Sequence, residues 1–199
     1  MIVATASHTP LHNYPKRNTN ATKESERALF VILICMIQPD EKYMKMAIEA
    51  AVQSAKNGDY GHGAVVVKDG EVIATGYETL KSANDPVNGH AEVDAIRKAC
   101  QKLQQPYLQG CIMYCTAEPC PMCMSAIIWA KMSDVAYAIT RDDMIAEMER
   151  IKQTSGGRFS WRQIAIPAEY LVERGEPKVT LHPGFMREES RKLFDLTGA

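Results

Sequence analysis

The chain has 199 residues, of which 46% are hydrophobic and 24% charged, a composition ordinary for a soluble globular protein with one sizeable core. Its 23 Lys and Arg against 24 Asp and Glu give a formal net charge of −1. Proteins that grip a long nucleic acid usually carry a basic excess, so the charge balance favours a small substrate and argues against a polynucleotide partner.

Residues 1–38 are expected to form an N-terminal extension, followed by one domain over 39–199. The start is polar and aperiodic, whereas 28–37, ALFVILICMI, is apolar. Ten residues are too few to span a bilayer as a helix. The run also lacks the flanks of a signal peptide. We interpret it as a buried strand or docking segment and expect a cytoplasmic protein without a membrane span.

The domain is expected to begin with a helix over 40–57, where apolar residues recur at helical spacing after Asp40, a candidate N-cap. Two β-branched runs then flank Asp69-Gly70, the pair that a type I′ hairpin turn prefers. The later pattern predicts helices at 90–104, 120–131, 142–152 and 187–196, and strands at 111–116, 134–140 and 178–182.

A helix, a hairpin and then strands alternating with helices describe a three-layer α/β domain with a mixed sheet. Residues 153–177 do not fit this alternation. A connection of that length is usually functional or mobile. We therefore treat 153–177 as an insertion within the domain and as a candidate lid.

The stretch AEPCPMCMSAI carries Cys120 and Cys123, and Cys115 lies five residues upstream. The three have the spacing of a plant-type iron–sulfur site, but that site needs a fourth cysteine and none follows Cys123. A redox pair also uses C-x-x-C at a helix start, and a structural zinc site needs a second pair of ligands. Zinc held by three protein ligands with an open fourth position needs only one more ligand.

His90, in NGHAEVDAIRKA, is the candidate third ligand. It begins a predicted helix, as Cys120 and Cys123 do, and a helix start favours thiolates. Two helix starts meeting over zinc would leave the fourth position for a water of lowered pKa. Glu92 would reach that water and pass its proton to a substrate nitrogen. Considered alone, His90 is best interpreted as a helix cap and Glu92 as a solvated acid in the first turn. Considered together with Cys120 and Cys123, the two residues favour a catalytic metal site.

The motifs HAE at 90–92 and PCPMC at 119–123 resemble those of the zinc-dependent cytidine and nucleobase deaminases. GAVVVKDG, NDPVNGHAEVDAIRKAC and EPCPMCMSAIIWA are most similar to guanine and guanosine deaminases, then to tRNA adenosine deaminases. The resemblance covers about 40–150. It implies a cytidine-deaminase-like α/β/α fold with a five-stranded mixed sheet, one Zn²⁺ per chain and a homodimer.

The resemblance also implies the reaction, hydrolytic deamination of a nucleobase or nucleoside, with guanine or guanosine favoured. Water activated by zinc would replace the exocyclic amine with a carbonyl, and ammonia would leave. The motif assigns His90, Cys120 and Cys123 to the metal and Glu92 to proton transfer. The alternatives are a tRNA adenosine deaminase, a cytosine-type nucleoside or nucleotide deaminase, and an inactive zinc-bound scaffold; the presence of Glu92 counts against the last.

The substrate is expected to lie between Ala64, Ala91 and the third helix, where His62 and Glu78 would position it. His62 would stack on the base, or else be a solvated loop histidine. The guanine enzymes carry an asparagine where this chain has Glu78, and an ionised glutamate offers acceptors only. The alternative for Glu78 is a surface residue at a strand end. Trp129 is a candidate stacking wall, although a core position is the favoured interpretation.

The unmatched segment contributes one more candidate substrate contact, Trp161, in SGGRFSWRQ. Aromatic faces stack on bases, arginines pair with phosphate or carbonyl oxygens, and glycine hinges suit a closing lid. The hypothesis is that the segment folds over the zinc site. A surface insertion whose aromatics patch the core or a dimer contact is the favoured alternative.

Overall fold

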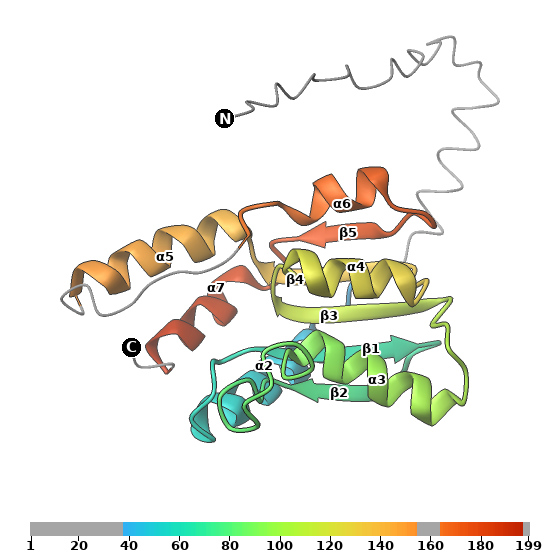
Figure 1. Ribbon diagram of the computed structural model, residues 1–199, viewed down its shortest axis with the longest axis horizontal. Coiled ribbons are helices and arrows are strands. Elements are labelled where there is room, and N and C mark those ends of the chain that lie inside the picture. The colour runs from blue at the N-terminus through green and yellow to red at the C-terminus, as the bar shows by residue number, and fades with distance from the viewer. Residues whose placement is uncertain (1–37, 155–163, 197–199) are drawn as a thin grey trace, which may run out of the picture. The chain divides into compact units, whose positions relative to one another are not determined.

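Five strands form one mixed sheet, in the order β2-β1-β3-β4-β5, in the computed structural model, which describes residues 38–154 and 164–196 (Figure 1). β1 pairs antiparallel with both β2 and β3, whereas β4 and β5 run parallel to β3. The strands are β1 Gly63–Lys68, β2 Glu71–Tyr77, β3 Cys111–Ala117, β4 Asp134–Ile139 and β5 Thr180–Pro183.

Helices cover both faces of this sheet, which gives the predicted three layers. The helical elements are α2 Glu41–Lys56, α3 Ala91–Leu103, α4 Pro121–Trp129, α5 Arg141–Thr154, α6 Ala168–Arg174, α7 Arg187–Arg191 and the 3₁₀ helix η1 Lys192–Asp195. On one face α2 packs on Val65, Val67 and Tyr114. On the other, α3, α4 and α6 pack on Val66 and Met113. Neighbouring strand residues point to opposite faces, and the three central strands, β1, β3 and β4, are buried from both sides.

Most predicted elements are present within a few residues of their expected bounds. The carboxylate of Asp40 accepts a hydrogen bond from the backbone N–H of Lys42 at 2.9 Å, which confirms it as the N-cap of α2. Asp69 and Gly70 have φ angles of 50° and 81°, as a type I′ turn requires. The predicted last helix at 187–196 is present as α7, which continues directly into the 3₁₀ helix η1 with helical backbone angles at the junction.

Two differences lie near the predicted insertion. The last strand begins at Thr180 rather than at Lys178, because the ammonium of Lys178 donates to carbonyls at the end of α6. Within 153–177, α6 belongs to the core: Ala168 is fully buried, and Leu171 packs against the same cluster. That part of the segment is therefore built into the domain. Within the described ranges, every helix is too short or too polar to cross a membrane.

Gly76 of β2 lets α3 lie directly against the sheet. A Cβ atom there would lie 1.9 Å from the carbonyl oxygen of Ala91 and 2.7 Å from the backbone nitrogen of Ala95. No side chain fits at that distance, so only glycine allows this approach. The contact fixes the start of α3, and His90 immediately precedes that start.

Candidate metal centre and active site

Two helix N-termini bring the predicted ligands together. His90 is the N-cap residue of α3 and Cys120 that of α4, where Pro121 occupies a first-turn position. Cys123 follows in the first turn of α4 and is fully buried. One ligand atom from each of His90, Cys120 and Cys123 lies within 4.8 Å of the other two.

These separations suit zinc. A tetrahedral ion with Zn–S near 2.3 Å and Zn–N near 2.0 Å holds its nitrogen and sulfur ligands about 3.6 Å apart. Nδ1 of His90 lies 3.5 Å from Sγ of Cys123 and 3.9 Å from Sγ of Cys120. One imidazole and two thiols are a donor set that zinc prefers over hard cations. Cys115 is buried within β3 and is not a member of this group.

Hydrogen bonds link the side chains of His90, Cys120 and Cys123 and shift their pKa values in different directions. A hydrogen bond from Cys123 lowers the pKa of Cys120 to about 4. The hydrogen bond to Cys120 raises the pKa of His90 to about 9. The hydrogen bond to Cys120 is the main cause that raises the pKa of Cys123, and burial raises it further. A metal ion would take the place that the protons of these hydrogen bonds hold.

Glu92 adjoins the ligand group from the first turn of α3. Its side chain is almost fully buried, and Sγ of Cys123 donates to its Oε2 at 3.4 Å. Burial is the main cause that raises the pKa of Glu92, and the charge of Cys120 raises it further. A buried carboxyl with a raised pKa beside a metal-ligand group has the properties of a proton carrier.

Glu78 is not a surface residue, so that interpretation was wrong. Only 3% of it is exposed. Its backbone N–H donates to Oγ of Ser54 at 2.9 Å and to the carbonyl of His62 at 3.3 Å, which holds the residue directly after β2. Burial raises the pKa of Glu78 to about 8, with opposing contributions from His90 and Glu92. Because Gly76 lies against Ala91, the end of β2 that leads into Glu78 adjoins the start of α3, which His90 caps.

His62 is partly buried rather than a solvated loop histidine. Burial, followed by the charge of His90, lowers its pKa to about 4, so the ring is neutral near pH 7. It lines a small cavity of about 40 Å³ together with Thr116 and Ala117 at the end of β3. Ala64 and Ala91 are both buried near this end of the sheet: Ala64 pairs with Cys115 of β3, and Ala91 lies against Gly76, the partner of Ala64 in β2.

The C-terminal elements close that cavity, which the sequence did not reveal. Ser190 of α7 and Leu193 and Phe194 of η1 line it, with Met148 of α5. Ser190, Leu193 and Phe194 lie more than a hundred residues from His62 in the chain, and no motif marked them. Their contact with the cavity depends on the return of the chain through β5.

Two tryptophans were predicted to contact the substrate, and the structure describes only one of them. Trp129 ends α4 and is 81% exposed, so its interpretation as a core residue was wrong. Cys120 caps the opposite end of that helix, and the contact of Trp129 with a substrate stays a prediction. Trp161 and the residues 155–163 around it lie outside the described residues, and so do residues 1–37 of the predicted extension.

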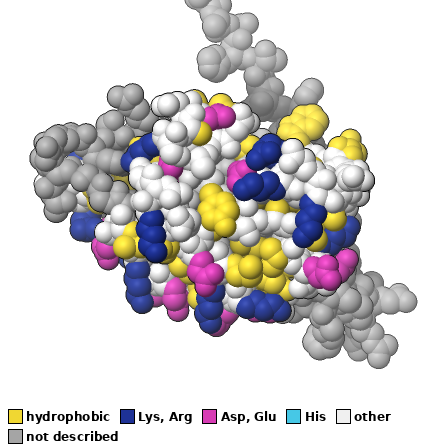
Figure 2. All heavy atoms as spheres, turned by 90° about the horizontal axis from the view of Figure 1, so that it is seen from below, with side chains coloured by type: hydrophobic (Ala, Val, Ile, Leu, Met, Phe, Trp, Pro, Cys, Tyr) yellow, Lys and Arg dark blue, Asp and Glu magenta, His cyan; other side chains and the backbone are white. Residues whose placement is uncertain are grey.

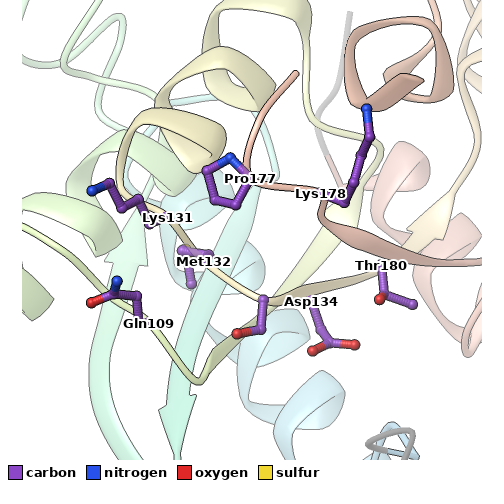
Figure 3. Close-up of a pocket in the computed structure, with 8 residues that line it drawn as sticks. Gln109, Lys131, Met132, Asp134, Pro177, Lys178 and Thr180 are labelled. Atoms are coloured by element: carbon purple, nitrogen blue, oxygen red, sulfur yellow. The ribbon is translucent and has the colours of Figure 1, made fainter. Parts of the chain in front are cut away.

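A larger hollow of about 540 Å³ lies where β4 and β5 begin (Figure 3), whereas Cys120 and Cys123 follow the end of β3. Its three charged side chains have partners within the protein. Lys131 lies 3.7 Å from the centre of the Tyr107 ring, Lys178 holds the end of α6, and Asp134 pairs with His182. This hollow therefore offers no reactive group comparable to the metal-ligand group.

Comparison with known proteins agrees with this site. The profile described as the cytidine and deoxycytidylate deaminase zinc-binding region matches residues 37–139, more than half of the chain. A guanine deaminase of Bacillus subtilis is 46% identical over 104 residues, and a tRNA-specific adenosine deaminase of Aquifex aeolicus is 36% identical over 98 residues. Those alignments cover 52% and 49% of this chain.

The aligned stretches span 66% and 64% of those two curated relatives, slightly less than two thirds of their length. The solved structure of a guanine deaminase from Nitrosomonas europaea superposes with a TM-score of 0.64, over 94% of this chain and 100% of that one. Its sequence identity is 20%, so this likeness concerns the fold, which it confirms as cytidine-deaminase-like.

Proposed function

The chain belongs to the cytidine and deoxycytidylate deaminase zinc-binding family, and from that premise we propose that it is a hydrolytic deaminase of nucleobases or nucleosides. It would replace an exocyclic amine with a carbonyl and release ammonia. The observation that carries the proposal is the meeting of His90, Cys120 and Cys123 within 4.8 Å, with Glu92 in contact with Cys123.

In this proposal His90, Cys120 and Cys123 hold one Zn²⁺. The bound metal would supply an activated water as the nucleophile. Glu92 would take a proton from that water and deliver it to a ring nitrogen of the substrate. It would then take the remaining proton of the added hydroxyl and pass it to the amine, which would leave as ammonia while the carbonyl forms. The buried position of Glu92 supports this role, because a carboxyl shielded from solvent holds its proton at higher pH.

We propose guanine or guanosine as the substrate class, on the likeness to the guanine deaminase. His62 would stack on the base, since its ring is neutral and lines a cavity at the site. Glu78 would read an edge of the base, because its carboxyl is buried beside the metal-ligand group. Ala64 and Ala91 would form the close wall against which the ring lies.

The second candidate is deamination of adenosine in tRNA, favoured by the 36% identical relative. A long RNA substrate calls for a basic surface. The net charge of −1 gives no such excess, and Figure 2 shows acidic and basic side chains interspersed on the face seen from below. We therefore rank the small substrate first. We also propose, from the family, that the chain acts as a homodimer.

The test is an ammonia-release assay on zinc-loaded protein with a panel of bases, nucleosides, nucleotides and a tRNA anticodon stem-loop. The proposal expects release from guanine or guanosine and none from Glu92→Gln. Ammonia release from the stem-loop alone would mean that the substrate is tRNA rather than guanine or guanosine, and would leave hydrolytic deamination as the reaction. Zinc-loaded protein that releases ammonia from no member of the panel would contradict the proposed activity.

A further inference from the structure

Two buried charged residues grip the short loop that joins β3 to Cys120. Glu118 directly follows β3, and Arg141 begins α5; the side chain of each is 4% exposed. Oε2 of Glu118 accepts the backbone N–H of Arg141 at 2.7 Å, and Oε1 accepts that of Ala168 at 2.8 Å. One carboxylate therefore joins the loop to the starts of α5 and α6.

Arg141 binds the same loop a second time. Its guanidinium donates to the carbonyl of Pro119 at 3.2 Å, and its Nε lies 3.8 Å from Oε1 of Glu118. The Pro119 carbonyl belongs to the peptide bond that leads into Cys120. The loop is thus held on both residues that precede the ligand, by groups shielded from water.

We propose that Glu118 and Arg141 are positioning residues that fix Cys120 in place to hold zinc. The inference rests on the metal centre of the proposed function. Neither residue reaches the ligand atoms in this role; each acts through the backbone of the loop. Partners outside the ligand shell commonly change metal affinity by about 10–100-fold when they are removed.

The alternative to a positioning role is a purely structural one, in which the buried ion pair stabilises the junction of β3, α5 and α6 and has no effect on metal binding. The two roles differ in what each mutation changes. If the pair is purely structural, its removal lowers the melting temperature and leaves the rate of zinc release unchanged. If the pair positions Cys120, its removal also speeds zinc release, because Cys120 then samples positions from which the Sγ–metal bond is broken.

The chain offers a matched control in Asp134, a buried acid at the start of β4 whose Oδ1 lies 3.0 Å from Nε2 of His182. Each change to the amide keeps the shape of a buried acid that faces one basic side chain. Asp134 begins β4, and the far end of β4 leads to Arg141. The control therefore lies at the opposite end of the strands from the loop that precedes Cys120.

The experiment measures zinc release from holoprotein into excess chromogenic chelator for wild type, Glu118→Gln, Arg141→Lys, their double variant and Asp134→Asn. We expect each Glu118 and Arg141 variant to release zinc at least about 10-fold faster than Asp134→Asn at a comparable melting temperature. Because Glu118 and Arg141 act on the same loop, the double variant should release zinc at the rate of the faster single variant, within about 2-fold.

Cobalt replaces zinc in a second measurement, which also serves if Glu118→Gln folds poorly. The sulfur-to-cobalt absorption reports how Cys120 and Cys123 surround the ion, and we expect it to shift in Arg141→Lys and not in Asp134→Asn. Release rates and spectra equal to those of the control would overturn the positioning role. Wild-type protein that holds no zinc would instead contradict the metal centre itself, and neither readout uses ammonia release.

Discussion

Nδ1 of His90 and Sγ of Cys123 lie 3.5 Å apart, although 33 positions separate the two residues in the chain. The approach depends on how α3 and α4 are mounted. Gly76 lets α3 rest on β2, and the antiparallel pairing of β1 with β3 brings the end of β3, which leads into α4, beside that helix. The metal-ligand group is therefore a product of the sheet order.

Zinc removal provides the first prediction. Metal analysis should find one zinc per chain in wild type, and removal by chelator should lower the melting temperature, because a ligand that binds only the folded state stabilises it. Cys120→Ala should lose the metal. The matched variant Cys115→Ala should keep it, since Cys115 is buried in β3 outside the ligand group. Zinc loss in Cys115→Ala with intact Cys120 would mean that the ligand set is wrong.

Glu92→Gln tests proton transfer. The amide keeps the shape of the side chain but cannot carry the proton, so turnover should fall by at least about 100-fold while zinc stays bound. Ammonia release and metal content should be measured on the same preparation. Glu49→Gln, an exposed change on α2, is the control and should match wild type. Near-normal turnover in Glu92→Gln would remove this residue from the mechanism.

Glu78→Asn tests which group reads the base. An amide offers a donor and an acceptor in place of a carboxyl, so relative kcat/KM should move between guanine-like and other bases by about 10-fold or more. Glu71→Asn, at the exposed start of β2, should leave the ratios unchanged. If both variants keep the wild-type ratios and fold normally, Glu78 does not contact the base.

The pH dependence of stability isolates the burial of Glu78. Burial raises its pKa from about 4.5 to about 8, so the folded zinc-free chain holds this proton more tightly than the unfolded chain does. The stabilising contribution is complete below about pH 4.5 and is lost as the pH rises through 8. Glu78→Gln carries no titratable group and should lack this loss. Urea unfolding of both zinc-free proteins from pH 5 to 9 measures the difference; parallel curves would contradict the burial of an ionisable carboxyl.

The sequence alone predicted that His90, Cys120 and Cys123 would meet, because each lies in a short motif at a helix start, where spacing determines geometry. It also located the hairpin turn, since Asp69 and Gly70 adopt the positive φ angles that their types favour. It did not predict Glu118 or Arg141 as functional, because their contacts join residues 23 positions apart across two parallel strands. Trp129 was misjudged because a nonpolar helix does not reveal which of its sides the sheet covers.

The last prediction compares two glycines that face different helices. A Cβ on Gly76 would lie 1.9 Å from the carbonyl of Ala91 in α3, and one on Gly63 would lie 2.2 Å from the carbonyl of Ala47 in α2. Backbone atoms cannot yield by rotating a side chain, so both alanine variants should be destabilised by roughly 1–3 kcal/mol or more.

Only one of these helices presents a ligand. Gly76→Ala pushes on the first turn of α3, directly after His90, and should release zinc at least about 10-fold faster into a chelator. Gly63→Ala pushes on the middle of α2 and should keep a release rate close to that of wild type at a similar melting temperature. Equal acceleration in both variants would show that general loss of stability governs zinc release, and that the docking of α3 on β2 has no special part in holding His90.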